Sequence, residues 1–182
     1  MSPDLMEVFR NGLAEIISVG SDANTDWEQI THADQVEQSA GSAEVLLGFD
    51  SAAGLFLRAG SAAFKYLVRY HGNSIGINSL AFRLQPQKRR LQDGVEKIRV
   101  LLQDWQAADL QINKKDDSLT VTAVPVQVDK FVAGQVVWLH FIAGLFQEMF
   151  YWAGGGKQYP FQVKVGEDNN SLVICFQLQP VD

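Results

Sequence analysis

The sequence predicts an α+β domain in which a mainly antiparallel sheet of about four to five strands packs against a helical layer. Two pairs of short alternating segments predict the sheet, because tight hairpins force antiparallel pairing. Apolar residues at helical spacing predict the helices, and the clearest of these runs from residue 87 to 106. With 182 residues, the chain is long enough for one domain with its own core.

An amphipathic helix is expected first. Ser2, Pro3 and Asp4 form a helix start signal, and Gly20 ends the helix. Its apolar face consists of Leu5, Phe9, Leu13, Ile16 and Ile17. Residues 21–42 lack clear periodicity and are expected to connect this helix to the rest. We therefore divide the chain into an N-terminal helix and connection (1–43) and an α+β domain (44–182).

The α+β domain is expected to begin with a short strand over 44–49, followed by a helix over about 52–71 that Asp50 and Ser51 cap. A loop then leads to Pro86 and the helix over 87–106. The expected buried face of the first helix is Leu57, Gly60, Phe64, Leu67 and His71. That of the second is Leu91, Val95, Ile98, Leu102 and Trp105.

The two expected hairpins enclose a fourth helix. The first hairpin pairs 110–112 with 119–122, and the second pairs 161–165 with 172–178 across a turn at 166–170. The helix over about 131–153 is apolar almost all round and must be covered on several sides. In the second hairpin the expected inward residues are Phe161, Val163 and Val165, facing Ile174, Phe176 and Leu178.

Composition excludes several classes of function. A formal net charge of -6 argues against nonspecific nucleic-acid binding and against docking on anionic membrane by charge. The single cysteine, Cys175, excludes an internal disulfide and points to a reducing compartment, so a cytoplasmic location is expected. No signal peptide is visible, and the apolar run from Val136 to Phe146 is too short to span a bilayer.

From Glu96 onward the order of elements carries a family resemblance. An amphipathic helix and a hairpin precede a helix with the segment Phe141-Ile142-Ala143-Gly144-Leu145-Phe146, and the final hairpin ends in Cys175-Phe176-Gln177-Leu178. Upstream, residues 54–60 look like a first core helix. Over roughly 44–180 the chain resembles the 4-vinyl reductase-type small-molecule-binding domain, a relative of the core subunits of TRAPP trafficking complexes.

This resemblance implies a domain that binds apolar or aromatic small molecules in a cleft between helices and sheet, or one that assembles as a dimer. Relatives occur as sensor domains of transcription activators and in proteins linked to bacteriochlorophyll synthesis. Several relatives bind zinc through cysteines near the last hairpin. Val163, Lys164 and Val165 stand there in this chain, so neither a metal site nor a cofactor is expected.

Crowded aromatic residues on the helix over 131–153 give the candidate pocket. Part of such a stripe is ordinary core, but its excess over what two hairpins can cover favours a ligand cleft or a dimer interface. His140 is either a satisfied core histidine or a polar group that orients a ligand. The candidate pocket residues are Phe64, Leu67, Trp138, His140, Phe141 and Leu145.

The remaining reactive residues have plainer interpretations. Cys175 has no cation near it in sequence and is expected to be a buried structural residue. His32 lies in a segment that offers at most a weak surface metal site. The glycines at 154–156 follow a helix instead of preceding one, so they mark a helix stop and not a phosphate loop. A basic cluster is either a solvated helix start or a contact for an acidic partner or anionic group: Arg83, Lys88, Arg89 and Arg90.

These observations favour a noncatalytic binding module for an apolar or aromatic small molecule, in a homodimer. A dimeric assembly protein without a ligand is the alternative. A tetrapyrrole reductase or its accessory protein comes third, because the sequence contains no dinucleotide fingerprint, iron–sulfur cysteines or acid–base pair.

Overall fold

The computed structural model describes residues 2–20, 30–31, 35–126 and 134–181. Helices α1 (Leu5–Gly20), α3 (Val36–Leu47) and α4 (Phe49–Tyr66) come first, and a π-helix, η1 (Leu67–His71), continues α4. Helices α5 (Leu80–Arg83) and α6 (Gln87–Asp104) precede strands β1 (Ala108–Lys114) and β2 (Ser118–Pro125). Helix α7 (Gln135–Ala153) and strands β3 (Phe161–Val165) and β4 (Leu172–Gln177) complete the chain.

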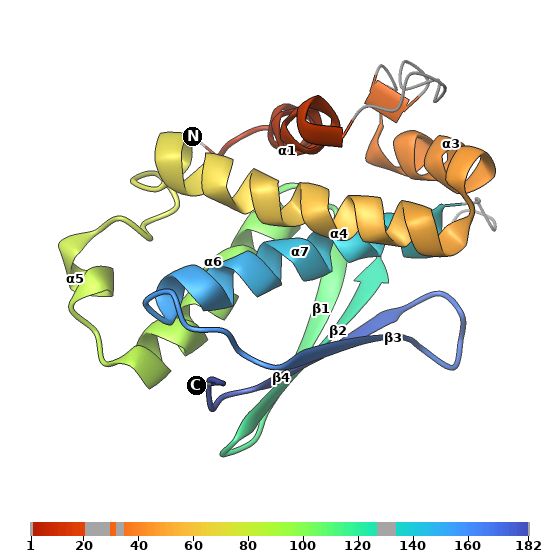
Figure 1. Ribbon diagram of the computed structural model, residues 1–182. Helices are drawn as coiled ribbons and strands as arrows, with labels where there is room; N and C mark the ends of the chain where they lie inside the picture. The colour runs from red at the N-terminus through yellow and green to blue at the C-terminus, as the bar shows by residue number, and fades with distance from the viewer. Residues whose placement is uncertain (1, 21–29, 32–34, 127–133, 182) are drawn as a thin grey trace.

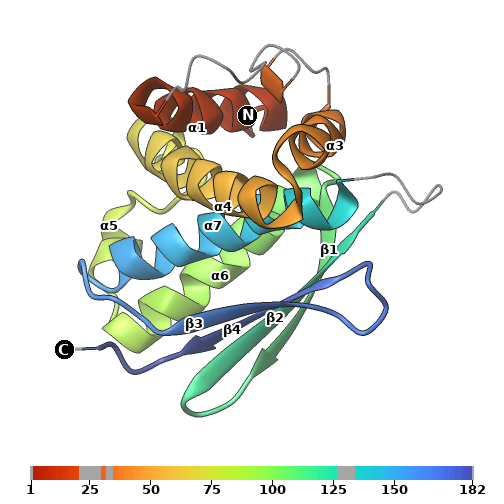
Figure 2. The ribbon, with the colours of Figure 1, turned by 45° about the vertical axis from the view of Figure 1, so that its right-hand side comes forward.

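These elements form a layered α+β structure, which confirms the predicted fold class (Figure 1). The four strands form one antiparallel sheet in the order β1-β2-β4-β3. Helices α6 and α7 pack on one face of this sheet, α4 packs on α7, and α1 and α3 lie beyond α4. Figure 2 shows α4 and α7 running alongside each other above the sheet, with α6 next to α7.

The sandwiched position of α7 explains its composition. It contacts α4 on one side and the sheet on the other, with α6 beside it, so almost no part of its surface faces water. Gly60 of α4 and Gly144 of α7 let the two backbones approach: a Cβ built on Gly60 would lie 2.0 Å from the Phe141 carbonyl oxygen. The predicted apolar helix is therefore confirmed over the described residues, and its start before Gly134 lies outside them.

The amphipathic helices follow the predicted pattern. The four expected apolar residues within α6 are fully buried in the core, and Trp105, which follows the helix, is partly buried. In α1, Phe9 and Leu13 are fully buried against α4. Arg90 of α6 donates hydrogen bonds to the Ala153 carbonyl oxygen at 2.5 Å and to that of Arg83 at 3.2 Å, placing positive charge at the C-terminus of α7.

The strand expected over 44–49 is wrong, because these residues end α3 and begin α4. Helix α3 also occupies part of the expected connection, and it crosses the proposed division at residue 43. Its buried face is made of small residues and one valine at helical spacing: Val36, Ser39, Ala40 and Ala43. Short apolar runs do not distinguish a strand from a helix by periodicity, and Val45 and Leu46 in this run are exposed.

Both hairpins are confirmed, with one change in the second. Phe161 pairs with Phe176 and Val163 with Ile174, so these four residues face one another as the two expected sets. The register places Val165 opposite Leu172, and Leu172 is buried while Val165 is 40% exposed. Leu178 lies beyond the strand. Within the described residues, no helix is both long and apolar enough to cross a membrane.

Candidate functional site

A cavity of about 420 Å³ lies between three parts of the chain that are distant in sequence. We call it the seam cavity. Ser2 comes from the segment before α1, Ser74 and Ile75 from the stretch after η1, and the remaining wall from α6. The α6 residues are Asp93, Glu96, Lys97, Val100, Leu101 and Asp104. A molecule bound here would touch all three parts at once.

Lys97 connects two of these parts directly. Its ammonium donates a hydrogen bond to the Ile75 carbonyl oxygen at 3.2 Å and lies 5.7 Å from the ring centre of Phe82 in α5. The turn beneath it requires glycine, because Gly76 has a φ of 75° and a Cβ there would meet the Lys97 ammonium at 2.7 Å. Lys97 thus holds the stretch after η1 and α5 against α6.

The other charges of the seam cavity are carboxylates. Glu96 accepts hydrogen bonds from Arg99 at 2.7 Å and Lys114 at 3.0 Å, and the bond from Arg99 is the main reason why the pKa of Glu96 lies below its ordinary value. Asp93 accepts a hydrogen bond at 2.6 Å from the neutral amide of Gln85, so its charge is not compensated there. Asp104 is exposed at the end of α6. The described wall therefore carries one ammonium and three carboxylates, and two of these carboxylates, Asp93 and Asp104, have no cation among the described ion pairs.

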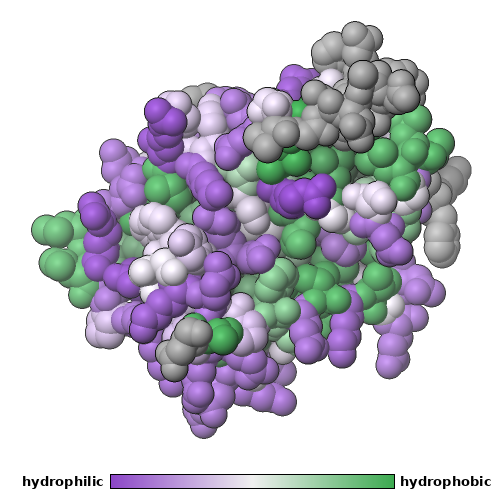
Figure 3. Space-filling model, in the orientation of Figure 1, coloured by the Kyte–Doolittle hydropathy of each residue, from purple (hydrophilic) through white to green (hydrophobic). Residues whose placement is uncertain are grey.

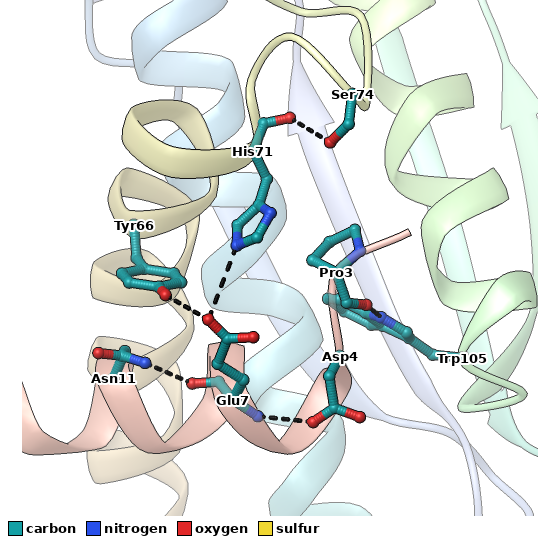
Figure 4. Close-up of polar contacts among 8 residues, drawn as sticks. All are labelled: Pro3, Asp4, Glu7, Asn11, Tyr66, His71, Ser74 and Trp105. Atoms are coloured by element: carbon teal, nitrogen blue, oxygen red, sulfur yellow. Dashed lines mark hydrogen bonds and ion pairs between the residues drawn. The ribbon is translucent and has the colours of Figure 1, made fainter. Parts of the chain in front are cut away.

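A cluster of polar side chains, Glu7, Tyr66 and His71, joins α1 to the end of α4 and to η1 beside the seam cavity (Figure 4). One carboxylate oxygen of Glu7 accepts a hydrogen bond from the Tyr66 hydroxyl at 2.6 Å and lies 3.9 Å from Nε2 of His71. The bond to Glu7 raises the pKa of Tyr66 above its ordinary value. The His71 carbonyl oxygen accepts a hydrogen bond from Ser74 at 2.8 Å. Ser74 lines the seam cavity, so the two features share a wall.

The segment before α1 is held in place by hydrogen bonds to Trp105 and within the start of α1. The indole Nε1 of Trp105 donates a hydrogen bond to the Pro3 carbonyl oxygen at 2.6 Å. Asp4 caps α1 by accepting a hydrogen bond from the backbone N–H of Glu7 at 2.9 Å. The position of Ser2 in the cavity wall therefore depends on contacts with both α1 and the end of α6.

Five of the six candidate pocket residues lie in the core, where α4 meets α7. Each is at most 1% exposed: Phe64, Leu67, Trp138, Phe141 and Leu145. None of them lines either of the two described cavities, the seam cavity and a cavity of about 240 Å³ next to Tyr159. Their assignment to a ligand remains a prediction.

His140 points away from that core. Its Nδ1 lies 2.9 Å from the Val136 carbonyl oxygen of its own helix, and its ring meets Phe49 edge-on, with ring centres 5.9 Å apart. Burial is the main cause that lowers its pKa, which favours the neutral imidazole. This geometry corresponds to the satisfied histidine of the two alternatives. His32 lies outside the described residues.

Cys175 is half-buried, on the sheet face opposite to the buried side chains of β4. Its sulfur lies 3.7 Å from the Thr120 hydroxyl. The side chain is thus less buried than the sequence predicts. Alternation along β4 is the reason, because Ile174 and Phe176 occupy the inward positions. In the basic cluster, Arg90 binds backbone carbonyl groups, and the three others are exposed: Arg83, Lys88 and Arg89.

No family model matches the chain, and no curated protein matches it either. Solved structures do. A structure of an Fe(II) unliganded H-NOX protein from K. algicida matches with a TM-score of 0.59 and 11% identity, over 100% of this chain and 97% of that one. An oxygen-binding H-NOX domain related to soluble guanylate cyclases matches with a TM-score of 0.54 and 14% identity, over the same shares of the two chains. The chain has the H-NOX fold.

A third H-NOX structure, from work on heme distortion in that family, matches with a TM-score of 0.57 and 11% identity over 97% of this chain and 96% of that one. These matches overturn the resemblance to 4-vinyl reductase-type domains and TRAPP subunits. The function drawn from it, binding of an apolar or aromatic small molecule or an assembly role, is wrong with it. The motifs misled because they follow from packing: Gly144 permits a close helix contact and Phe176 an inward strand position.

Sequence pattern does not reveal the seam cavity, because the charged residues that α6 contributes are typical of the solvated face of an amphipathic helix. One local signal was present. Val100 is an apolar residue within that polar face, and it is 48% exposed. The contributions of Ser2 and Ile75 have no counterpart in a local pattern, because they join α6 only through the fold.

Proposed function

We propose that the chain is a non-enzymatic sensory domain that binds a small organic cation in the seam cavity. The observation that carries this proposal is the wall of the cavity, which the segment before α1, the stretch after η1 and α6 build together. A ligand that bridges these three parts changes how firmly they are held, and a change of this kind is what a sensor transmits.

The chemistry of the wall supports a cationic ligand. Lys97 is committed to the Ile75 carbonyl oxygen and the Phe82 ring, whereas Asp93 and Asp104 have no cation bonded to them among the described ion pairs. Ile75, Val100 and Leu101 add an apolar wall. Carboxylates beside an apolar surface suit a compact cation that carries carbon groups.

A sensory role also agrees with what the solved relatives are said to do. One is an oxygen-binding domain related to soluble guanylate cyclases. Another, with a TM-score of 0.52 and 13% identity, was studied for the mechanism of H-NOX activation. The first description names oxygen binding and the second names activation, and for this chain they support a sensor in preference to an enzyme.

Thermal unfolding with a set of small probes tests this proposal. The probes are choline, putrescine and agmatine, with acetate and phosphate as anionic controls. At a concentration 100 times its dissociation constant, a ligand stabilises by about 2.7 kcal/mol, which raises Tm by several degrees in a chain of this size. We expect such a rise with at least one cation and none with the anions.

A pair of variants locates the site. Val100→Trp fills the seam cavity, whereas Val45→Trp places the same side chain on α3 at a position that is 80% exposed. The rise in Tm should be lost in Val100→Trp and kept in Val45→Trp. A rise that survives in Val100→Trp, or no rise with any cation, would refute the proposal.

The homodimer expected from the sequence remains a prediction. Apolar surface suited to self-association occurs at the α3–α4 corner, where Val45 is 80% exposed, Leu46 42% and Phe49 38%. Further apolar surface lies over α5 (Figure 3), where Leu80 and Leu84 are exposed. Native mass spectrometry at several protein concentrations tests the dimer, and Leu46→Glu together with Phe49→Glu should dissociate it if the α3–α4 corner forms the interface.

A further inference from the structure

We infer that this H-NOX fold functions without heme. Heme proteins hold the iron through an axial side chain, which is histidine, cysteine, methionine or tyrosine. That side chain must face a cavity that accepts a flat macrocycle. The described residues meet neither requirement, whichever molecule occupies the seam cavity.

The cavities fail the first requirement. Among the residues that the structure describes, no histidine, cysteine, methionine or tyrosine lines the seam cavity, and its α6 wall carries charged residues at four positions, Asp93, Glu96, Lys97 and Asp104. The cavity of about 240 Å³ includes Tyr159 in its wall. The hydroxyl of Tyr159 is hydrogen-bonded to the side-chain amide of Gln87, and burial raises its pKa, which opposes the phenolate form that binds iron.

The two described histidines face protein groups. Nε2 of His71 lies 3.9 Å from the Glu7 carboxylate oxygen that accepts the hydrogen bond of the Tyr66 hydroxyl, and it is buried without a hydrogen-bond partner among the described residues (Figure 4). Nδ1 of His140 is engaged by its own helix, and the ring packs against Phe49. Neither imidazole lines a described cavity.

The sulfur atoms of Cys175 and Met149 are placed no better. Cys175 lies on the open face of the sheet beside Thr120. Met149 is buried between α7 and α6, where a Cβ built on Gly94 would lie 2.5 Å from its sulfur. That distance leaves no space for a macrocycle between the two helices at this point.

The interior that α1, α4 and α7 share is filled with side chains. Phe9 of α1 contacts Phe56 of α4 and Phe141 of α7, with ring centres 5.4 Å and 5.5 Å apart. The helices also meet backbone to backbone, since a Cβ on Gly12 would lie 2.4 Å from the Ala59 carbonyl oxygen and one on Gly144 would lie 2.0 Å from that of Leu57. A flat cofactor cannot enter these contacts without separating the helices.

Heme reconstitution tests this inference on the full chain. The protein is expressed with added 5-aminolevulinate, and its heme content is measured by the pyridine hemochromogen assay. The purified protein is then titrated with hemin and, under reducing anaerobic conditions, with Fe(II) heme. We expect no stoichiometric heme after purification, a spectrum of unligated heme during titration, and an unfolding midpoint that hemin does not raise.

Single alanine variants of His32, His71 and His140 decide the meaning of any binding that appears. His32 is included because the structure does not describe it. Weak heme absorption that all three variants retain indicates adsorption to the surface and agrees with the inference. A one-to-one complex whose Soret band is lost in one variant overturns it. The cation assay uses the same heme-free protein, so failure of the sensory proposal and failure of this inference give separate results.

Discussion

Replacing Gly60 with alanine should destabilise the fold, although alanine favours helices. The added Cβ would lie 2.0 Å from the Phe141 carbonyl oxygen and 3.0 Å from the backbone nitrogen of Leu145. Backbone atoms of a buried helix cannot move aside as a flexible side chain can, so α4 and α7 must separate. Overpacking of this kind costs about 3 kcal/mol, and the gain in helix propensity returns about 1 kcal/mol. The expected net loss is about 2 kcal/mol.

Gly54 provides the matched control, because it lies in the same helix and a Cβ there would meet only Arg58, at 3.6 Å. Gly54→Ala should stabilise the protein by about 0.5–1 kcal/mol through helix propensity alone. Urea denaturation of both variants and the parent chain gives the free energies of unfolding. If Gly60→Ala is as stable as Gly54→Ala, the close contact of α4 with α7 is wrong, and the argument for a filled interior loses its main support.

Three further changes test other contacts. Arg90→Met removes the hydrogen bond and the positive charge at the Ala153 carbonyl oxygen and should cost about 1–2 kcal/mol in urea denaturation, whereas Arg89→Met, at an exposed neighbour, should change little. Trp105→Phe removes the bond to the Pro3 carbonyl oxygen and should cost about 1 kcal/mol; equal stability would mean that this bond does not hold the N-terminal segment. Burial raises the pKa of Glu148, so its contribution favours folding at low pH and is lost as pH rises through the raised pKa. Glu148→Gln should therefore raise Tm above that of the parent chain at pH 7 by more than it does at pH 4, as measured by thermal unfolding at both pH values. An equal change in Tm at the two pH values would contradict the burial of this carboxyl group.

The sequence predicted those elements whose local pattern and tertiary position agree. Helix α6 has one apolar face and one partner layer, so periodicity alone identified its buried residues. Helix α7 was recognised as a covered helix because its residues are apolar all round. In α3 the buried face uses Ser39 and Ala43 while Val45 is exposed. The most hydrophobic residues of this segment therefore do not mark the buried face of α3, and this is why the sequence predicted a strand there.

The candidate site was less predictable for a related reason. Aromatic residues on α7 suggested a pocket, but aromatic side chains fill a core as readily as they line a cavity, and Trp138 and Phe141 are fully buried. The seam cavity depends on charged residues that look like an ordinary solvated face, and on Ser2, which is about one hundred positions away from Asp104 in the chain. A local sequence pattern cannot predict that residues so far apart in the chain line the same cavity.

The strand order β1-β2-β4-β3 also sets the order in which the sheet can form. The turn of the first hairpin closes between Lys114 and Leu119, which are neighbours in the chain apart from the turn itself. The first pair between β2 and β4 joins Ala123 to Leu172, which are 49 positions apart. Loop closure of the second kind costs about 2 kcal/mol more in chain entropy. The first hairpin can therefore form early with only local closure, whereas the pairing of β2 with β4 must close a loop that contains α7. We expect the docking of α7 on α4 to precede this closure, so substitutions at the contact between α4 and α7 should slow folding more than substitutions in either hairpin turn.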